Sequence, residues 1–125
     1  MIEVSGVVKD FKISRGLFRG KDVLRAVDDV SLTIESGEVL AIVGESGCGK
    51  TTLARIILGL LPPDLGAVKF NGTALSDFKK LELARLVQPI FQDPYSSLNP
   101  RKTIGEIIEL PLRVQGSRAG NDRKK

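Results

Sequence analysis

The distribution of apolar and polar residues along the first third of the chain predicts two strands. Residues 2–13 are rich in apolar and β-branched side chains, which favours a strand. Val30, Leu32 and Ile34 alternate with residues that carry hydroxyl groups, and this period of two is typical of a strand with one buried face. The segment SRGLFRGKD between them shows no period, so we expect an exposed loop there.

The middle of the chain predicts a turn, a buried strand and a helix. Residues 35–38 (ESGE) predict the turn, and the uninterrupted apolar run at 39–43 (VLAIV) is typical of a parallel strand covered on both faces. Beyond a glycine-rich stretch, five apolar residues follow the spacing of one helical face. They are Leu53, Ile56, Ile57, Leu60 and Leu61. We expect Pro62 and Pro63 to end this helix.

The last third predicts shorter elements. Residues 67–71 predict a strand, residues 77–86 a helical stretch, and the residues before PIFQDP another strand. Residues 103–114 predict a helix that Pro111 breaks. Strands come first and a strand–loop–helix unit lies in the middle, which indicates an α/β protein.

Composition narrows the possible chemistry. The 125 residues suit one modest domain or a piece of a larger one, with 42% hydrophobic residues and a net charge of +4. The chain has no histidine and one cysteine, which excludes a Ser-His-Asp triad, a histidine zinc site and an internal disulfide. The N-terminus does not look like a signal peptide, so we expect an intracellular protein. Residues 117–125 predict a polar, basic and disordered tail.

The glycine-rich stretch at 44–52, GESGCGKTT, matches the phosphate-binding pattern G-x-x-x-x-G-K-[ST]. Glycines let backbone N–H groups approach a phosphate, and the first N–H groups of the following helix are unpaired. Lys50 can reach the terminal phosphates, and the Thr51 hydroxyl can bind Mg²⁺. The alternative is a glycine-rich turn with a solvated lysine. The predicted nucleotide-binding residues here are Gly44, Glu45, Ser46, Gly47, Cys48, Gly49, Lys50, Thr51 and Thr52.

Two longer segments resemble one known family. They are VSLTIESGEVLAIVGESGCGKTTLARIILGLLPPDLGAVKFNG and IFQDPYSSLNPR. With them, residues 1–116 resemble the N-terminal half of an ABC transporter ATP-binding domain, in its oligopeptide, dipeptide and nickel importer branch. The resemblance implies part of a P-loop NTPase fold, with an antiparallel β-subdomain and the strand–loop–helix of a parallel sheet. It also implies that ATP and Mg²⁺ bind, and that ATP hydrolysis drives uptake of peptides or similar solutes.

The same resemblance implies roles outside the glycine loop. Phe11 would stack on adenine; the alternative is a core residue of the strand. Gln92 would contact Mg²⁺ and the attacking water. The predicted catalytic residues are therefore Lys50 and Gln92, and the predicted metal ligands are Thr51 and Gln92. The alternative for Gln92 is a loop glutamine without a role. Residues 95–101, from Tyr95 to Arg101, would face permease subunits, or form a plain surface loop.

The resemblance further implies a second ATP-binding subunit, a place on the cytoplasmic face of the membrane, and no nucleic-acid partner. Hydrolysis in this family needs motifs that these residues lack. After the glycine loop there is no apolar run followed by Asp-Glu and no LSGGQ-like signature, and the switch histidine is absent. We therefore expect a truncated half cassette that binds ATP without hydrolysing it efficiently. The rival interpretations are another P-loop NTPase and a non-catalytic module that binds nucleotide or nucleic acid.

Overall fold

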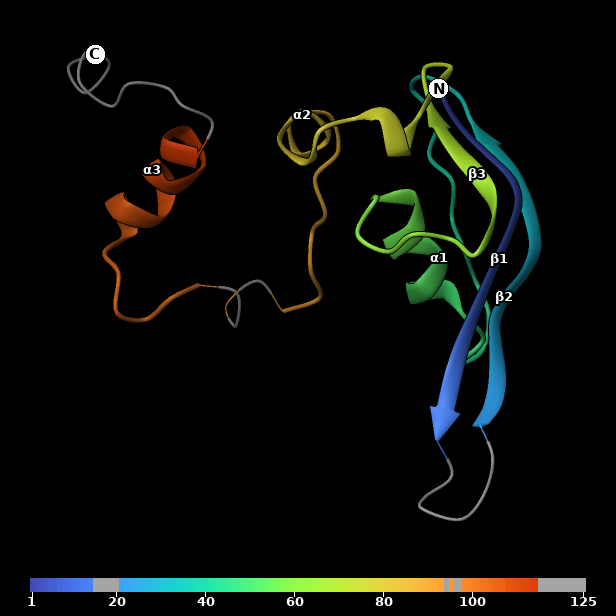
Figure 1. The fold of residues 1–125 in the computed structure, drawn as a ribbon. Helices are drawn as coiled ribbons and strands as arrows, with labels where there is room; N and C mark the ends of the chain where they lie inside the picture. The colour runs from blue at the N-terminus through green and yellow to red at the C-terminus, as the bar shows by residue number, and fades with distance from the viewer. Residues whose placement is uncertain (15–20, 94, 96–97, 115–125) are drawn as a thin grey trace. The chain divides into compact units, whose positions relative to one another are not determined.

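The computed structural model describes residues 1–14, 21–93, 95 and 98–114 (Figure 1). The chain divides into two units, which separate after Val87. The predicted loop at 15–20 and the predicted tail at 117–125 lie outside the described residues.

The first unit is built on a four-stranded antiparallel sheet with the strand order β2-β1-β3-β4. The strands are β1 (Ile2–Ser14), β2 (Lys21–Ile34), β3 (Leu65–Phe70) and β4 (Thr73–Ala74). The strands predicted at 2–13, 30–34 and 67–71 are therefore confirmed, with shifted ends. Figure 1 shows β1 and β2 as long neighbours, with a helix beside the sheet.

Bulges interrupt the ladder between β1 and β2. Lys9 pairs with Val27 and Asp10 with Arg25, so Ala26 is an extra residue on β2. Another register shift lies between Val4 and Val7 of β1. The extra residue, Ala26, is the one whose carbonyl lies closest to Gly49.

The amphipathic helix is α1 (Lys50–Ile57), and it ends earlier than the prolines predict. Gly59 takes a φ of 67°, and its N–H donates to the Ile56 carbonyl at 2.9 Å, while the Leu60 N–H donates to the Arg55 carbonyl at 2.9 Å. This pair of bonds is a Schellman motif, which closes the helix before Pro62. Leu60, predicted on the buried face, is 60% exposed because it lies beyond the helix end.

The core of the first unit lies between α1 and one face of the sheet. Val7 on β1 and Ile56 on α1 are the most deeply buried side chains, with 0% and 1% exposure. The buried cluster consists of Val4, Val7, Val27, Leu53, Ile56 and Val68. This packing fixes α1, and therefore the residues that precede it, against β1 and β2.

The rest of the first unit follows the sequence pattern. Asn71 and Gly72, with φ of 49° and 80°, make the tight turn between β3 and β4, where positive φ is required. The helical stretch predicted at 77–86 forms as a 3₁₀ turn, η1 (Leu75–Asp77), and the helix α2 (Lys80–Leu86). The turn predicted at 35–38 is confirmed by a hydrogen bond from the Glu38 N–H to the Glu35 carbonyl at 3.2 Å.

The buried parallel strand predicted at 39–43 is wrong for this structure. These residues have no strand pairing, and Val39 and Val43 are 95% and 88% exposed. A strand needs hydrogen-bonded neighbours, and no strand of the described residues runs beside this segment. An apolar segment without such neighbours presents its edge for association.

The second unit contains α3 (Ile104–Val114) and the turns before it. The Thr103 N–H donates to Glu106 Oε2 at 2.9 Å and the Glu106 N–H donates to Thr103 Oγ1 at 3.3 Å, which forms a capping box. Pro111 lies inside the helix, so the predicted break is wrong; the helix continues with one main-chain hydrogen bond fewer.

The strand predicted before residue 89 is also wrong, because residues 87–91 have no pairing and Ile90 is 97% exposed. No helix in the described part of the chain is long and apolar enough to span a bilayer.

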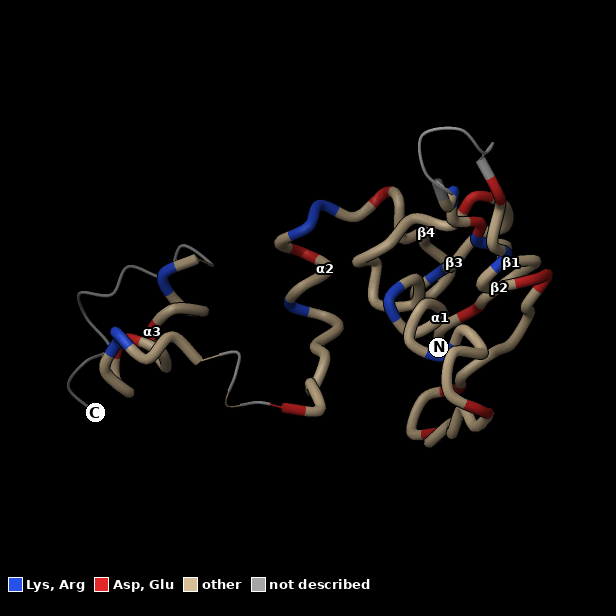
Figure 2. The backbone as a smooth tube through the Cα atoms, turned by 90° about the horizontal axis from the view of Figure 1, so that it is seen from below, with Lys and Arg blue, Asp and Glu red and all other residues tan. Residues whose placement is uncertain are grey.

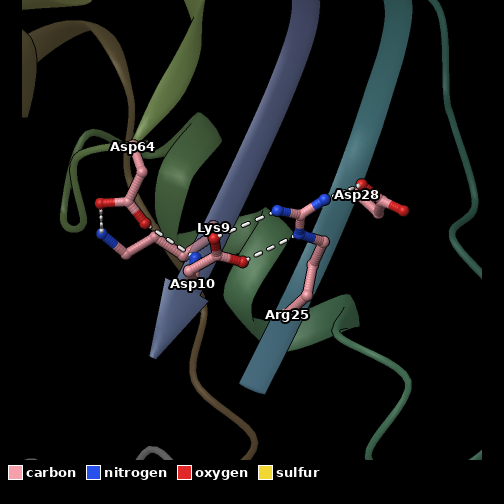
Figure 3. Close-up of polar contacts among 5 residues, drawn as sticks. All are labelled: Lys9, Asp10, Arg25, Asp28 and Asp64. Atoms are coloured by element: carbon pink, nitrogen blue, oxygen red, sulfur yellow. Dashed lines mark hydrogen bonds and ion pairs between the residues drawn. The ribbon is translucent and has the colours of Figure 1, made fainter. Parts of the chain in front are cut away.

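A carboxylate fastens the start of β3 to β1 (Figure 3). The Asp64 N–H donates to the Val8 carbonyl at 2.9 Å, and Asp64 Oδ2 accepts from the Asp10 N–H at 2.7 Å. Asp64 Oδ1 accepts from Lys9 Nζ at 3.1 Å. The bond from the Asp10 N–H, together with Lys9, lowers the pKa of Asp64 below its ordinary value.

We predict that Asp64→Asn removes part of the acid sensitivity of the fold. Because the folded state lowers the pKa of Asp64, its stabilising effect is complete above the ordinary value of 3.8 and is lost as the pH falls through the lowered folded value. Chemical denaturation followed by circular dichroism from pH 7 to pH 2 measures this. The variant should be less stable at neutral pH and lose less on acidification. Asp77→Asn, outside this network, is the control, and equal acid profiles for Asp64→Asn and the original chain would refute the assignment.

We predict that Val39→Lys reduces self-association of the 125-residue chain. A charge in the exposed apolar segment 39–43 opposes edge-to-edge pairing. Sedimentation velocity over a range of concentrations measures the effect, with Leu60→Lys as a matched exposed control. If both variants associate as the original chain does, the segment is not the associating edge.

Candidate functional site

The glycine loop reaches α1 through Gly49, which lies against the backbone of β2. Gly49 has a φ of 94°, and a Cβ placed on it would lie 2.1 Å from the Ala26 carbonyl oxygen. No residue with a side chain fits this approach. Gly47 also has a positive φ, 83°, but a Cβ there would meet nothing within 4 Å. The bulge at Ala26 and the missing side chain at Gly49 together set the position of the loop.

The N-terminus of α1 is suited to an anion. Gly49 is its N-cap residue and provides no side-chain hydrogen bond, and the first turn contains no acidic residue. The first N–H groups of a helix have no partner inside the helix, and the helix dipole places partial positive charge beside them. An uncapped helix start next to a glycine loop is a phosphate-binding arrangement.

Lys50 lies over the loop that precedes it. Its Nζ donates to the Gly44 carbonyl at 2.7 Å and to the Glu45 carbonyl at 2.5 Å. The same ammonium lies 3.6 Å from Cys48 Sγ. A full positive charge is thus held beside the uncapped start of α1, and the loop residues fit a polyphosphate.

A magnesium ion at this loop would depend on the phosphates for most of its ligands. Among the described residues, no group of three His, Cys, Asp or Glu side chains could hold a metal ion. Thr51, in the first turn of α1, is exposed and carries the hydroxyl that would complete such a site, and Thr52 follows it, half-buried. Mg²⁺ is commonly held in this way, by substrate phosphates with few protein ligands.

Phe11 lies on the same face of the sheet as the loop. Phe11 pairs with Leu24 of β2, and two residues before it Lys9 pairs with Val27. Residues two apart on a strand share a face, so Phe11 and Lys9 lie on the same face of β1. Val27 marks this face as the one beside the loop, because a Cβ added to Gly49 would lie 3.9 Å from its side chain. Phe11 is 38% exposed and does not belong to the buried core. This placement favours an exposed aromatic platform over the alternative of a core residue.

Gln92 and residues 95–101 belong to the second unit. Gln92 is exposed. The Tyr95 N–H donates to Asp93 Oδ1 at 3.1 Å and the Arg101 N–H donates to Asn99 Oδ1 at 2.9 Å, while residues 96 and 97 lie outside the described residues. The predicted roles of Gln92 and of residues 95–101 stay predictions.

The contacts of three residues were not predicted from the sequence. These residues are Ala26, which contacts Gly49, and the pair Lys9 and Asp64. One signal was available: the alternation at 30–34 stops at Asp28 and Asp29, which indicates an irregular strand. The pairing of Lys9 with Asp64 joins residues 55 positions apart, and no local pattern reports it.

We predict that Gly49→Ala destabilises the first unit more than Gly47→Ala. Both substitutions place a side chain at positive φ, which costs about 1–2 kcal/mol. Gly49→Ala adds overpacking against the Ala26 carbonyl, so its total should exceed that of Gly47→Ala by about 1–3 kcal/mol. Urea denaturation measures both, and equal losses would contradict the close approach.

Comparison with known proteins agrees with this geometry. The family model described as ABC transporter matches residues 27–125. A probable peptide ABC transporter ATP-binding protein of Sinorhizobium fredii is 47% identical over 116 residues, covering 90% of this chain and 33% of that protein. A di/tripeptide transport ATP-binding protein of Pseudomonas aeruginosa is 40% identical over 95% of this chain and 38% of its own length. An oligopeptide transport ATP-binding protein of Bacillus subtilis is 41% identical over 100% of this chain and 40% of its own length.

Solved structures show the same fold. A dimeric ATP-binding cassette in a post-hydrolysis state, bound to ADP and Pi, matches with a TM-score of 0.71 and 30% identity. It covers 92% of this chain and 48% of that one. A second dimeric structure, of a bacterial ABC transporter cassette, matches with a TM-score of 0.71 and 32% identity. The chain therefore spans between a third and a half of the proteins that it matches.

Proposed function

This chain belongs to the ABC transporter ATP-binding family, and we propose that it binds Mg-ATP at residues 44–52 as part of a peptide importer. The observation that carries the proposal is the position of Lys50, whose ammonium lies over the loop beside the uncapped N-terminus of α1. Full and partial positive charges converge there, which suits a triphosphate.

Each loop residue has a role in this proposal. Main-chain N–H groups of residues 45–51 would donate to phosphate oxygens, because no side chain at Gly47 covers the loop backbone and Gly49 holds the loop against β2. Lys50 would leave the Gly44 and Glu45 carbonyls for the terminal phosphates, a stronger charge-assisted partner. Thr51 would bind Mg²⁺ through its hydroxyl. Phe11 would stack on the adenine ring through its exposed face.

Bound Mg-ATP supplies the phosphoanhydride bond whose hydrolysis drives transport. In our proposal Gln92 accepts a hydrogen bond from the attacking water and contacts the metal, since a side-chain amide can do both. The described residues contain Lys50 and Gln92 but no carboxylate pair at the end of an apolar strand. We therefore propose that this chain alone binds ATP and does not hydrolyse it efficiently.

The names of the relatives support a proposal for the solute. Their names give peptides, dipeptides, tripeptides or oligopeptides as transported solutes, so we propose a peptide importer. We also propose that residues 95–101 contact permease subunits on the cytoplasmic face of the membrane, and that a second ATP-binding subunit completes the assembly. The dimeric cassettes with the same fold support the last proposal.

Charge distribution favours this proposal over a nucleic-acid module. Figure 2 shows acidic and basic positions intermixed along the first unit. A groove that follows a nucleic-acid backbone has positive charge gathered on one face, with aromatic side chains between the basic ones.

We predict that a fluorescent ATP analogue binds the chain saturably with Mg²⁺, and that Lys50→Ala weakens this binding about 10- to 100-fold through loss of a charge-assisted hydrogen bond. Fluorescence titration measures the affinity, and urea denaturation of the variant controls for folding. Unlabelled ATP and GTP should compete about equally, because a stacking platform does not read the edge of a base. The absence of a saturable signal, or an unchanged affinity for Lys50→Ala, would refute ATP binding at this loop.

We predict that Mg-ATP slows alkylation of Cys48, which is exposed and lies in the proposed phosphate loop. Timed labelling with a maleimide, followed by intact-mass measurement, gives the rate, and the single cysteine makes the reading unambiguous. Lys50→Ala should lose the protection. Equal labelling rates with and without Mg-ATP would place the nucleotide elsewhere.

A further inference from the structure

We propose that Lys9, held by Asp64, is a positioning residue for the aromatic platform Phe11. This inference rests on the proposed function and goes beyond it, because it assigns a role to an ion pair outside the phosphate loop. The role is to hold the Phe11 ring in the orientation in which a planar base stacks on it. Lys9 itself does not contact the nucleotide.

The first observation is the burial of Lys9. Among the described residues it is the buried charged side chain, with 8% exposure. Lysine is rarely buried unless its charge is paired, because removing an ammonium from water is costly. The Asp64 carboxylate at 3.1 Å provides the pairing.

The second observation is that the anchor itself is fixed. Asp64 contacts the backbone of β1 twice, through its N–H to the Val8 carbonyl and through Oδ2 from the Asp10 N–H. Its other oxygen holds the Lys9 ammonium. The ammonium is therefore tied to the strand that carries Phe11, two residues further along.

The third observation is the contact with the ring. Lys9 Nζ lies 5.9 Å from the centroid of the Phe11 ring, within the range of a cation–π interaction. Phe11 as a whole residue is 38% exposed, and it lies outside the buried core. It is therefore held near Lys9 and remains accessible to a base.

The platform is also in line with the phosphate loop. Lys9 pairs with Val27, beside Gly49, and Phe11 lies two residues beyond Lys9, about 7 Å along the strand. A nucleotide with its phosphates at residues 44–52 would extend its base along this face. The position of Lys9 on β1 therefore lies between the two ends of the proposed site.

A neighbouring ion pair offers a matched control. Arg25 donates to Asp10 Oδ1 at 3.0 Å and to Asp28 Oδ1 at 3.1 Å, on the other side of β1 from Asp64 in Figure 3. Arg25→Met removes one positive charge, as Lys9→Met does, and leaves both Lys9 and Phe11 in place. It corrects for any general effect of charge on the binding of an anion.

The experiment compares two ligands, Mg-ATP and magnesium tripolyphosphate, which share a phosphate chain and differ by the nucleoside. Isothermal titration calorimetry measures both affinities for the 125-residue chain and its variants. Lys9→Met should weaken Mg-ATP about two- to five-fold, the range of a solvent-accessible cation–π interaction, and leave tripolyphosphate unchanged. Lys9→Arg, which keeps the charge and the ion pair, should retain both affinities. Arg25→Met should not change the ratio of the two affinities.

A double-mutant cycle tests the route through the ring. Phe11→Ala should also weaken Mg-ATP selectively, and Lys9→Met should have no further effect when Phe11 is already alanine. If Lys9→Met does not fold, Asp64→Asn is the second variant, since it releases the ammonium from its anchor and should give the same selective loss. Binding of tripolyphosphate shows in each case that the loop is folded.

Three results would overturn the inference. They are an unchanged affinity for Mg-ATP in Lys9→Met, an equal loss for both ligands, and additive effects of Lys9→Met and Phe11→Ala. Failure of the proposed function looks different, because the original chain would then bind neither ligand. That result would remove the inference together with the proposed site.

Discussion

The close approach of Gly49 to the Ala26 carbonyl is the constraint on which the site depends. It requires a residue without a side chain at positive φ and a bulge that leaves the β2 backbone available. Once it is made, α1 begins at Lys50, directly after the glycine loop and with no side-chain cap on its first N–H groups. The buried contacts of Leu53 and Ile56 with the sheet then hold the helix in that position.

The same face of the sheet carries the rest of the proposed site. Val27 lies under Gly49, Lys9 is its partner on β1, and Phe11 follows on the same face. Asp64 makes two hydrogen bonds with the backbone of β1 and a third with the Lys9 ammonium. The pairing of β1 with β2 therefore sets the position of Phe11 relative to the phosphate loop. A change in this pairing should alter the contacts of both the base and the phosphates of a bound nucleotide.

Much of this could be predicted from the sequence because it depends on local rules. The apolar and β-branched residues of β1, the alternation at the end of β2, the helical spacing of Leu53 and Ile56, and the loop pattern around Lys50 are all local patterns. The family was predicted correctly from the same residues and is confirmed by the comparisons. The helix end was predicted less well, since Gly59 in a Schellman motif ends α1 before the prolines can.

The rest depends on partners that a local pattern does not contain. The apolar run at 39–43 indicates a strand but supplies no neighbour for it, and its side chains are exposed in this structure. The burial of Lys9 requires Asp64, and the placement of Gly49 requires a bulge on β2. These are contacts between distant segments, whereas spacing and periodicity describe one segment at a time.

The central claim is that the amides of residues 45–51 bind the triphosphate of a magnesium nucleotide. Hydrogen–deuterium exchange of peptides from this loop, with and without saturating Mg-ATP, tests it most directly. The account predicts slower exchange in the loop and the first turn of α1, and unchanged exchange in β4 and η1. Exchange in the loop that is the same with and without Mg-ATP would contradict it.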